Sequence, residues 1–419
     1  MIDKFKINSI YNFFGSVIPA ALGLVAIIFL RGSLSYQEFI TLSFFWTLIT
    51  VVTISDLGMS RLASRESAAL RLKQIDLTQF ILRFKELIIT TFIISIFVSV
   101  FLYFLIHYFL SANVDKNSLS LIIISIPFYL VSFIFRGFLE GENSFFTVNI
   151  IKIFSSLIAF GIPIFQFVIF GQINYLWITF ILVISRMVIS LYVIVSKLSV
   201  FSVFFNSKLY KYNSQKYFLE SPMLAFGGIL GAVYIFFERS MFESYFPDFY
   251  SDFFIAHQLI LGLWIIPSSL SLAIYPTLAN TKLLSITQFI NKTLPYIFAI
   301  SIVFFSVIYL FLIFFQEEMN FNQVENDYFL PTVYLYLMFG AVTSAVAQVI
   351  NVTLLSSRDY KFIFIYQSII FVVYFVIQNT YGIANYLLFL FFWNTRYLID
   401  LIIIFSRTYF LGLKSRRNI

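Results

Sequence analysis

Long apolar stretches constrain this chain more than any other feature of its sequence. Stretches of the length that a helix needs to cross a bilayer, about 20 residues, recur along the chain with only short polar gaps. The gaps leave no room for a soluble catalytic domain. We therefore predict an all-α polytopic membrane protein with about twelve transmembrane helices. The predicted spans are 10–30, 39–57, 86–110, 119–139, 148–170, 174–196, 218–237, 253–275, 292–315, 329–355, 362–379 and 384–405.

The composition excludes several classes of site. Only 11% of the 419 residues are charged, against roughly 25% in a soluble domain. The chain has no Cys and only two His, His107 and His257, so we predict no disulfide, no metal site and no cofactor. The net charge of +7 is spread over short loops, and we therefore predict no nucleic-acid binding.

The distribution of basic residues predicts the orientation. With the N-terminus placed in the cytoplasm, most of the 27 Lys and Arg residues fall in cytoplasmic segments, while the outer loop at 316–328 is acidic. The positive-inside rule then predicts both termini in the cytoplasm. We expect a multi-pass protein of the bacterial inner membrane.

The chain divides into two halves of six spans each. We predict an N-terminal lobe at 1–197, a basic cytoplasmic linker at 198–217 and a C-terminal lobe with a cytoplasmic tail at 218–419. Arg396 follows Arg186 by 210 residues in a similar context, and Arg239 follows Arg31 by 208, although short apolar strings also align by chance. Copies that keep their direction across the membrane are parallel pseudo-repeats, which in transporters place the site at the lobe interface.

Helix-loosening residues occur in the first and seventh spans, where they predict bending that would let the lobes rock. These candidate hinges are Gly15, Pro19, Gly23, Gly227, Gly228 and Gly231.

Two arginines lie deep in predicted spans. A charge at mid-bilayer costs about 2.5 to 3.5 kcal/mol on insertion scales, so such a residue usually faces a cavity or a partner. Arg186 lies about 18 Å into its span at 1.5 Å per residue, which favours a functional role. Arg396 lies at a comparable depth, and Asp400 follows it by one turn, so a structural ion pair is an equal alternative there.

For the other polar and charged residues in the spans, a purely structural role is an alternative to a functional one. Arg136 and Lys152 lie near cytoplasmic helix ends, where long stems reach the headgroups. Arg31 and Arg239 lie at outer helix ends, where interface anchoring is the default. His257 and Gln258 are either functional or buried hydrogen-bonding groups. Three acids could carry a coupling ion when desolvated, namely Asp56, Glu220 and Asp400.

The sequence contains no nucleophile–base or metal constellation, and it does contain several inward cations. Arginine binds phosphate oxygens through two parallel hydrogen bonds. This combination favours moving an anion over transforming one. The predicted cationic cavity consists of Arg186, Arg396, Arg31, Arg136, Lys152 and Arg239.

Three segments resemble a known family. The run from Phe29 to Phe39 (FLRGSLSYQEF), with Asp56–Arg61 one span later, resembles the opening of O-antigen and capsule flippases (Wzx type). These belong to the multidrug/oligosaccharidyl-lipid/polysaccharide (MOP) flippase superfamily. Arg136–Glu142 is similar to that family's arginine- and glycine-rich segment, and Glu238-Arg239 to its acidic-Arg pair. The chain departs from the family at 36–39, where members of the family often have glycine and this chain has none.

The resemblance implies a MATE-like fold and a non-enzymatic transporter. The implied flippase moves an undecaprenyl-pyrophosphate-linked oligosaccharide from the cytoplasmic to the periplasmic leaflet by alternating access, coupled to H⁺ or Na⁺. Its implied partners are the lipid bilayer, the lipid-linked oligosaccharide, and the polysaccharide polymerase and chain-length machinery. The alternatives are a membrane-embedded polysaccharide polymerase or glycosyltransferase, and a multidrug exporter of the same superfamily. Capsule, teichoic and peptidoglycan precursors are alternative substrates.

Overall fold

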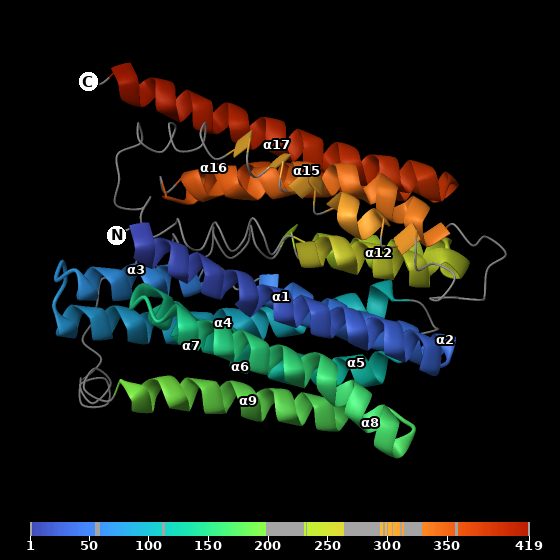
Figure 1. Cartoon of the computed structure of the whole chain (residues 1–419), viewed down its shortest axis with the longest axis horizontal. Helices are drawn as coiled ribbons and strands as arrows, with labels where there is room; N and C mark the ends of the chain where they lie inside the picture. The colour runs from blue at the N-terminus through green and yellow to red at the C-terminus, as the bar shows by residue number, and fades with distance from the viewer. Residues whose placement is uncertain are drawn as a thin grey trace. The chain divides into compact units, whose positions relative to one another are not determined.

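The structure, a computed structural model of the chain, is helical throughout the residues that it describes. These are residues 2–54, 59–110, 114–197, 230–231, 233–263, 294–295, 298–299, 301–303, 305–310, 312–313, 329–356 and 359–417. Short turns join the helices, and no strand occurs in these ranges (Figure 1). The predicted all-α fold class is confirmed.

Eight helical segments in the described part of the chain are long and apolar enough to cross a bilayer. They are Phe14–Ser33, Leu77–Phe109, Lys116–Gly141, Phe145–Phe170, Tyr175–Ser196, Leu330–Asn351, Lys361–Thr380 and Tyr386–Leu411. Each corresponds to one predicted span. Of the other four predicted spans, 39–57 falls on a shorter helix, and 218–237, 253–275 and 292–315 lie partly outside the described residues.

The chain forms two compact units. Unit 2 comprises Phe14–Phe237, and unit 1 comprises Met1–Phe13 together with Glu238–Ile419. The predicted linker at 198–217 lies outside the described residues. The predicted boundaries at 197 and 218 therefore stay a prediction.

Unit 2 is a bundle of helices joined by short connections. Its elements are α1 (Ile2–Ser33, from Phe14 on), α2 (Tyr36–Ile54), α3 (Met59–Arg71), α4 (Leu77–Phe109), α5 (Lys116–Ile122), η1 (Ile123–Ser125), α6 (Ile126–Gly141), α7 (Phe145–Ser156), η2 (Leu157–Gly161), α8 (Ile162–Phe170) and α9 (Tyr175–Ser196). Side-chain caps fix where two of them begin. Asp76 accepts a hydrogen bond from the Gln79 backbone N–H at 2.7 Å, and Asn174 accepts one from that of Trp177 at 3.2 Å, each satisfying an orphan donor of the first turn.

Unit 1 contains a helix at 238–245, which continues from 233–237, and the later helices. Its named elements are η3 (Pro247–Phe249), α12 (Tyr250–Leu263), α15 (Phe329–Ser356), α16 (Tyr360–Thr380), η4 (Gly382–Ala384) and α17 (Tyr386–Arg417). Asn394 ties α17 to α15, since its Oδ1 accepts from the Gly340 N–H at 2.7 Å and its Nδ2 donates to the Tyr336 carbonyl at 2.6 Å. A side chain at Gly340 would collide with Trp393 and Asn394, so the two helices approach closely.

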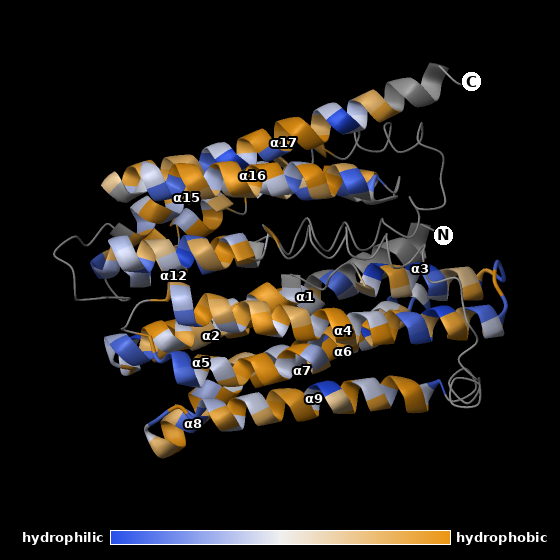
Figure 2. Cartoon of the chain, turned by 180° about the vertical axis from the view of Figure 1, so that it is seen from behind, coloured by the Kyte–Doolittle hydropathy of each residue, from blue (hydrophilic) through white to orange (hydrophobic). Residues whose placement is uncertain are grey.

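The outward faces of the spans are strongly apolar, as expected for surfaces in contact with lipid. On α4, Phe97 is 70% exposed, and α9 exposes Val195. The hydropathy colouring shows hydrophobic residues dominating both helices (Figure 2). In a soluble protein an exposed apolar area of this kind would mark an interaction site, and here it fits the bilayer.

Helix α3 is an element that the sequence analysis missed. We expected a cytoplasmic loop from 58 to 85, whereas 59–71 is helical and α4 starts at Leu77. A Cβ atom at Gly137 of α6 would meet the Ser60 backbone of α3, and one at Gly141 would meet the Ser64 backbone. Small residues let two helix backbones approach this closely, and that packing supports a helix whose sequence is too polar to predict as a span.

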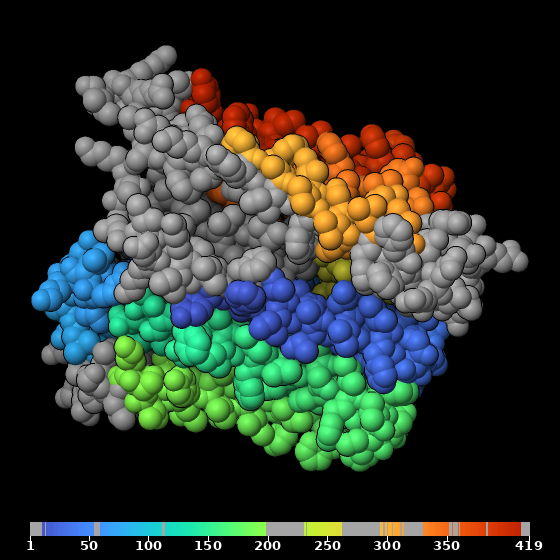
Figure 3. Space-filling model, viewed as in Figure 1, coloured from blue at the N-terminus to red at the C-terminus, as the bar shows by residue number. Residues whose placement is uncertain are grey.

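The α7–α8 segment contains a single π-helical turn, η2. Trp46 of α2 donates its indole N–H to the Ala159 carbonyl at 3.1 Å, and Phe160 packs on Trp46 with ring centroids 5.5 Å apart. A Cβ atom at Gly23 would lie 3.1 Å from Phe160 Cζ. In the space-filling view α1 lies along this segment (Figure 3). The turn is therefore held by two neighbouring helices.

Candidate functional site

Arg186 lies near the middle of α9, on the face that packs inside unit 2. The buried residues of this helix are Ile178, Thr179, Leu182, Ser185, Arg186, Ile189 and Val193. They recur every three or four positions and form one stripe. Met187 and Val188, the next two residues, are 49% and 52% exposed. The arginine therefore points away from the lipid-facing side of its own helix.

The guanidinium of Arg186 rests on the ring of Tyr129 from α6. Arg186 Cζ lies 3.8 Å from the ring centroid, a cation–π contact. Arg186 is 6% exposed and Tyr129 2% exposed. Within the described residues Arg186 makes no ion pair, and neither Arg186 Nε nor the Tyr129 hydroxyl has a hydrogen-bond partner. Arg186 is thus a buried cation that no described carboxylate neutralises.

A second basic cluster joins α6 and α7. Arg136 Nε lies 3.4 Å from Oε1 of Glu140, one turn further along α6, and its guanidinium lies over Phe133. The charges of Arg136 and Glu140 both act on Lys152 of α7. The side chain of Arg136 is 15% exposed. It folds back onto its own helix, and its reach to the headgroups stays a prediction.

Arg31 and Arg239, the two predicted interface anchors, are both buried in the structure, and their anchoring role stays a prediction. Arg31 is 8% exposed and lies over the Phe39 ring, 5.5 Å from its centroid. Arg239 is 0% exposed. We had placed Arg239 at a helix end, but its helix continues to residue 245, which puts the side chain inside the protein.

Glu238 forms the centre of the buried polar group of unit 1. Its side chain is completely buried, and its Oε1 lies 3.4 Å from Nη1 of Arg396 on α17. The two residues are 158 positions apart. Asp400, the partner that the sequence suggested for Arg396, interacts electrostatically with Arg396 and also hydrogen-bonds the Tyr366 side chain.

His257 of α12 connects Arg239 to Glu238. Arg239 Nε donates to His257 Nδ1 at 3.2 Å, and Arg239 Nη2 donates to Gln258 Oε1 at 2.8 Å. Because Nδ1 accepts, the proton of the neutral ring is assigned to Nε2, which faces Glu238 Oε2 at 3.7 Å. His257 is buried and Gln258 is half-buried, and both accept a hydrogen bond from Arg239.

The structure describes only some of the remaining candidate residues. Asp56, Glu220, Gly227 and Gly228 lie outside the described residues. Gly231 is helical, with open space where a Cβ would be.

The three hinge candidates of the first span lie within one continuous helix. Pro19 is inside α1. A Cβ atom at Gly15 would collide with Asn149, and one at Gly23 would crowd Phe160. In this structure the two glycines permit close helix contact, and their hinge role stays a prediction.

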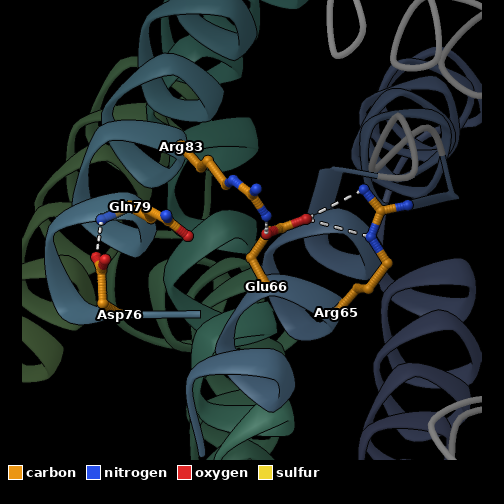
Figure 4. Close-up of polar contacts among 5 residues, drawn as sticks. All are labelled: Arg65, Glu66, Asp76, Gln79 and Arg83. Carbon is orange, nitrogen blue, oxygen red and sulfur yellow. Dashed lines mark hydrogen bonds and ion pairs between the residues drawn. The ribbon is translucent and has the colours of Figure 1, made fainter. Parts of the chain in front are cut away.

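Unit 2 also contains a buried carboxylate that we did not predict. Glu66 of α3 is 3% exposed, and its Oε2 lies 2.7 Å from Nη1 of Arg83 on α4. Its Oε1 accepts from Arg65 Nη2 at 3.1 Å (Figure 4). The figure shows the carboxylate between the two guanidinium groups. This arrangement ties α3 to the first turns of α4.

Tyr129 and the acid that pairs with Arg396 were missed for the same reason. Both contacts join helices that are far apart in sequence. The only local signal was the position of Glu238 directly before Arg239.

No protein-family model matches the chain. The chain is 26% identical over 308 residues to a putative O-antigen transporter of Shigella flexneri, which covers 70% of this chain and 71% of the relative. This similarity agrees with the resemblance to O-antigen flippases seen in the sequence.

Solved structures with a similar fold are transporters of the MOP superfamily. One, a multidrug-resistance MATE transporter in an outward-facing conformation, is 13% identical with a TM-score of 0.62 over 99% of this chain and 96% of that one. A MOP superfamily transporter from Pyrococcus furiosus, described as having a binding pocket of reversed polarity, has a TM-score of 0.65 at 13% identity, with the same coverage. A eukaryotic MATE transporter has a TM-score of 0.65 at 11% identity, over 99% of this chain and 98% of that one. The chain therefore has the MATE-like fold of MOP superfamily transporters, and it is similar in sequence to a putative O-antigen transporter.

Proposed function

We propose that this chain is a flippase for lipid-linked oligosaccharides. It moves an undecaprenyl-diphosphate-linked O-antigen or related repeat unit from the cytoplasmic to the periplasmic leaflet of the inner membrane by alternating access. The MATE-like fold and the similarity to a putative O-antigen transporter support a transporter of this class. Both termini lie in the cytoplasm in this proposal.

The observation that carries the proposal is the uncompensated charge of Arg186. The residue is 94% buried in a membrane-spanning helix, and its Nε–H has no partner among the described residues. A charge left in this state is costly, and arginine suits the oxygens of a phosphate. This burial supports a role for Arg186 in binding the diphosphate of the substrate, while the polyprenyl tail stays in lipid.

Complementation tests the function. A strain that lacks its own O-antigen flippase and makes a matching repeat unit receives the wild-type chain, Arg186→Ala or Arg186→Lys, and the lipopolysaccharide ladder is scored at equal protein levels. We expect a full ladder from the wild type, none from Arg186→Ala and a partial one from Arg186→Lys.

A neighbouring residue provides the control. Met187→Ala changes the next position of α9, on its exposed face, and should give the full ladder. A full ladder from Arg186→Ala would remove the proposed role of Arg186, and no ladder from the wild type would overturn the flippase itself.

Ion coupling is the finer part of the proposal. Asp56, Glu220 and Asp400 remain candidates for the coupling group, and Glu238 joins them. Glu238 faces Arg396 and His257, with Arg239 bonded to the other side of that ring. A proton on Glu238 would remove the charge that holds Arg396. Export by Glu238→Gln should therefore lose its response to uncouplers and external pH, whereas an unchanged response would exclude Glu238.

Multidrug export is the second candidate, because a solved structure of similar fold is a multidrug transporter. The buried arginines disfavour it, since they repel cationic drugs. Raised resistance to cationic dyes on expression, without a restored ladder, would favour this alternative.

A further inference from the structure

Two hydrogen-bond donors without partners lie side by side in unit 2. They are Nε–H of Arg186 on α9 and the hydroxyl of Tyr129 on α6. Both side chains are more than nine-tenths buried. Neither residue has any further contact that would satisfy these atoms within the described part of the chain. A buried donor without a partner is destabilising, so two in one place call for a ligand.

The cation–π contact brings the two donors close together. Arg186 Cζ lies 3.8 Å from the Tyr129 ring centroid. The N–H bonds of a guanidinium form a rigid fork, and the phenolic oxygen is attached to the ring that this guanidinium covers. An oxygen-rich anion bound beside this contact would accept from both residues.

Nearby hydroxyls do not compete for this role. Ser132, one turn after Tyr129, donates to the Tyr129 carbonyl at 2.7 Å. Ser185, next to Arg186, donates to the Leu182 carbonyl at 2.7 Å. Both serines thus satisfy the backbone of their own helices, and Arg186 and Tyr129 remain as the available donors.

We propose that Arg186 and Tyr129 together form an oxyanion site that takes a phosphate group of the lipid-linked substrate. This inference rests on the proposed function and adds Tyr129 to it as a second donor. The ring orients the guanidinium, and the hydroxyl supplies an additional hydrogen bond to phosphate oxygen. Both atoms are closed to solvent in this conformation, so the site binds its anion away from competing water.

Direct binding tests the site. The full chain is purified into nanodiscs, and the dissociation constant of radiolabelled undecaprenyl diphosphate is measured by scintillation proximity. A hydrogen bond to a charged group contributes about 1.5 to 3 kcal/mol, so Tyr129→Phe, which keeps the ring, should weaken binding at least about tenfold. Arg186→Met should weaken it more.

Two controls separate binding from packing. Undecaprenol, which lacks the diphosphate, should bind wild type and Tyr129→Phe equally. Tyr397→Phe is the matched variant, because Tyr397 lies beside Arg396 at 5.0 Å but that arginine is paired with Glu238. It should leave binding of undecaprenyl diphosphate unchanged.

The outcomes distinguish this inference from the proposed function. If Arg186→Met weakens diphosphate binding and Tyr129→Phe does not, the two-donor site is wrong and the role of Arg186 stands. If Tyr129→Phe weakens undecaprenol equally, Tyr129 acts through packing and the inference is overturned. If the wild type does not bind undecaprenyl diphosphate, both proposals fall.

Discussion

Arg186 in unit 2 and Arg396 in unit 1 share a residue type and a similar context, yet their surroundings differ. Arg396 faces the carboxylate of Glu238, and Arg239, His257 and Gln258 complete a polar network around that acid. Among the described residues, Arg186 has the Tyr129 ring as its neighbour and no carboxylate. Arg396 is thus part of a charge-balanced group in unit 1, whereas Arg186 is an uncompensated charge in unit 2.

The difference separates two uses of a buried cation. A buried ion pair is expensive to desolvate, and removing one partner leaves the other uncompensated. Arg396 therefore contributes to the internal integrity of unit 1. A buried cation without an acid is a cost that binding of an anion relieves, which is why unit 2 is our preferred place for the phosphate.

The largest effect on stability is expected from removing the acid of the Glu238–Arg396 pair in unit 1. Glu238→Ala removes the carboxylate that lies 3.4 Å from Nη1 of Arg396, and breaking a buried pair in this way costs about 3 to 5 kcal/mol. We expect a strong fall in melting temperature, measured by fluorescence-detected size exclusion after heating in detergent. A melting temperature equal to that of the wild type would mean that the network contributes nothing to stability.

A double substitution measures the pair itself. If Glu238 and Arg396 compensate each other, Arg396→Met should cost less in the Glu238→Gln background than in the wild type. Residues in one ion-pair network typically show coupling of about 0.5 to 3 kcal/mol. Additive effects in the double-mutant cycle would contradict the pairing.

A smaller effect on stability is expected at Glu66, the buried carboxylate of unit 2 that two arginines neutralise. Arg83→Met removes one of the two arginines on Glu66, but the side chain of Arg83 is 24% exposed and Arg65 remains. We expect a loss of stability of about 1 kcal/mol, close to the range of exposed ion pairs. A loss as large as that of Glu238→Ala would show that the α3–α4 contact depends on this ion pair.

The smallest change in stability is expected at Arg186. Arg186→Met removes a desolvated charge and also a cation–π contact, which contributes about 0.5 to 2 kcal/mol. The two effects oppose each other, so the melting temperature should stay within a few degrees of the wild type while export is lost. A collapse in protein level would place Arg186 among the structural residues, beside Arg396.

The sequence predicted the membrane class and most spans because the hydrophobic length of a span is a local property. The depth of Arg186 was predictable in the same way. The full set of partners was not, because Arg396 has an acid one turn away in Asp400 and also contacts Glu238 on a distant helix. Helix α3 was missed for a related reason, since its support comes from Gly137 and Gly141 of α6.

Glycines illustrate the same limit. Gly15 and Gly23 suggested bending, because glycine lowers the cost of departing from a helix. In the structure they are the positions where Asn149 and Phe160 approach α1. Whether a glycine permits bending or close helix contact depends on the neighbouring helix. The sequence of the span itself does not identify that neighbour.

The π-helical turn at Leu157–Gly161 has a consequence for the natural variation of this chain. Each residue advances an α-helix by about 100°, so a one-residue deletion in α7 would rotate everything after it and redirect its apolar face. A π-helical turn holds a surplus residue that such a deletion could remove, leaving a regular helix with α8 in place. Homologous chains should therefore tolerate a gap of one residue at 157–161 and avoid gaps on either side, with Trp46 free to change wherever that residue is missing.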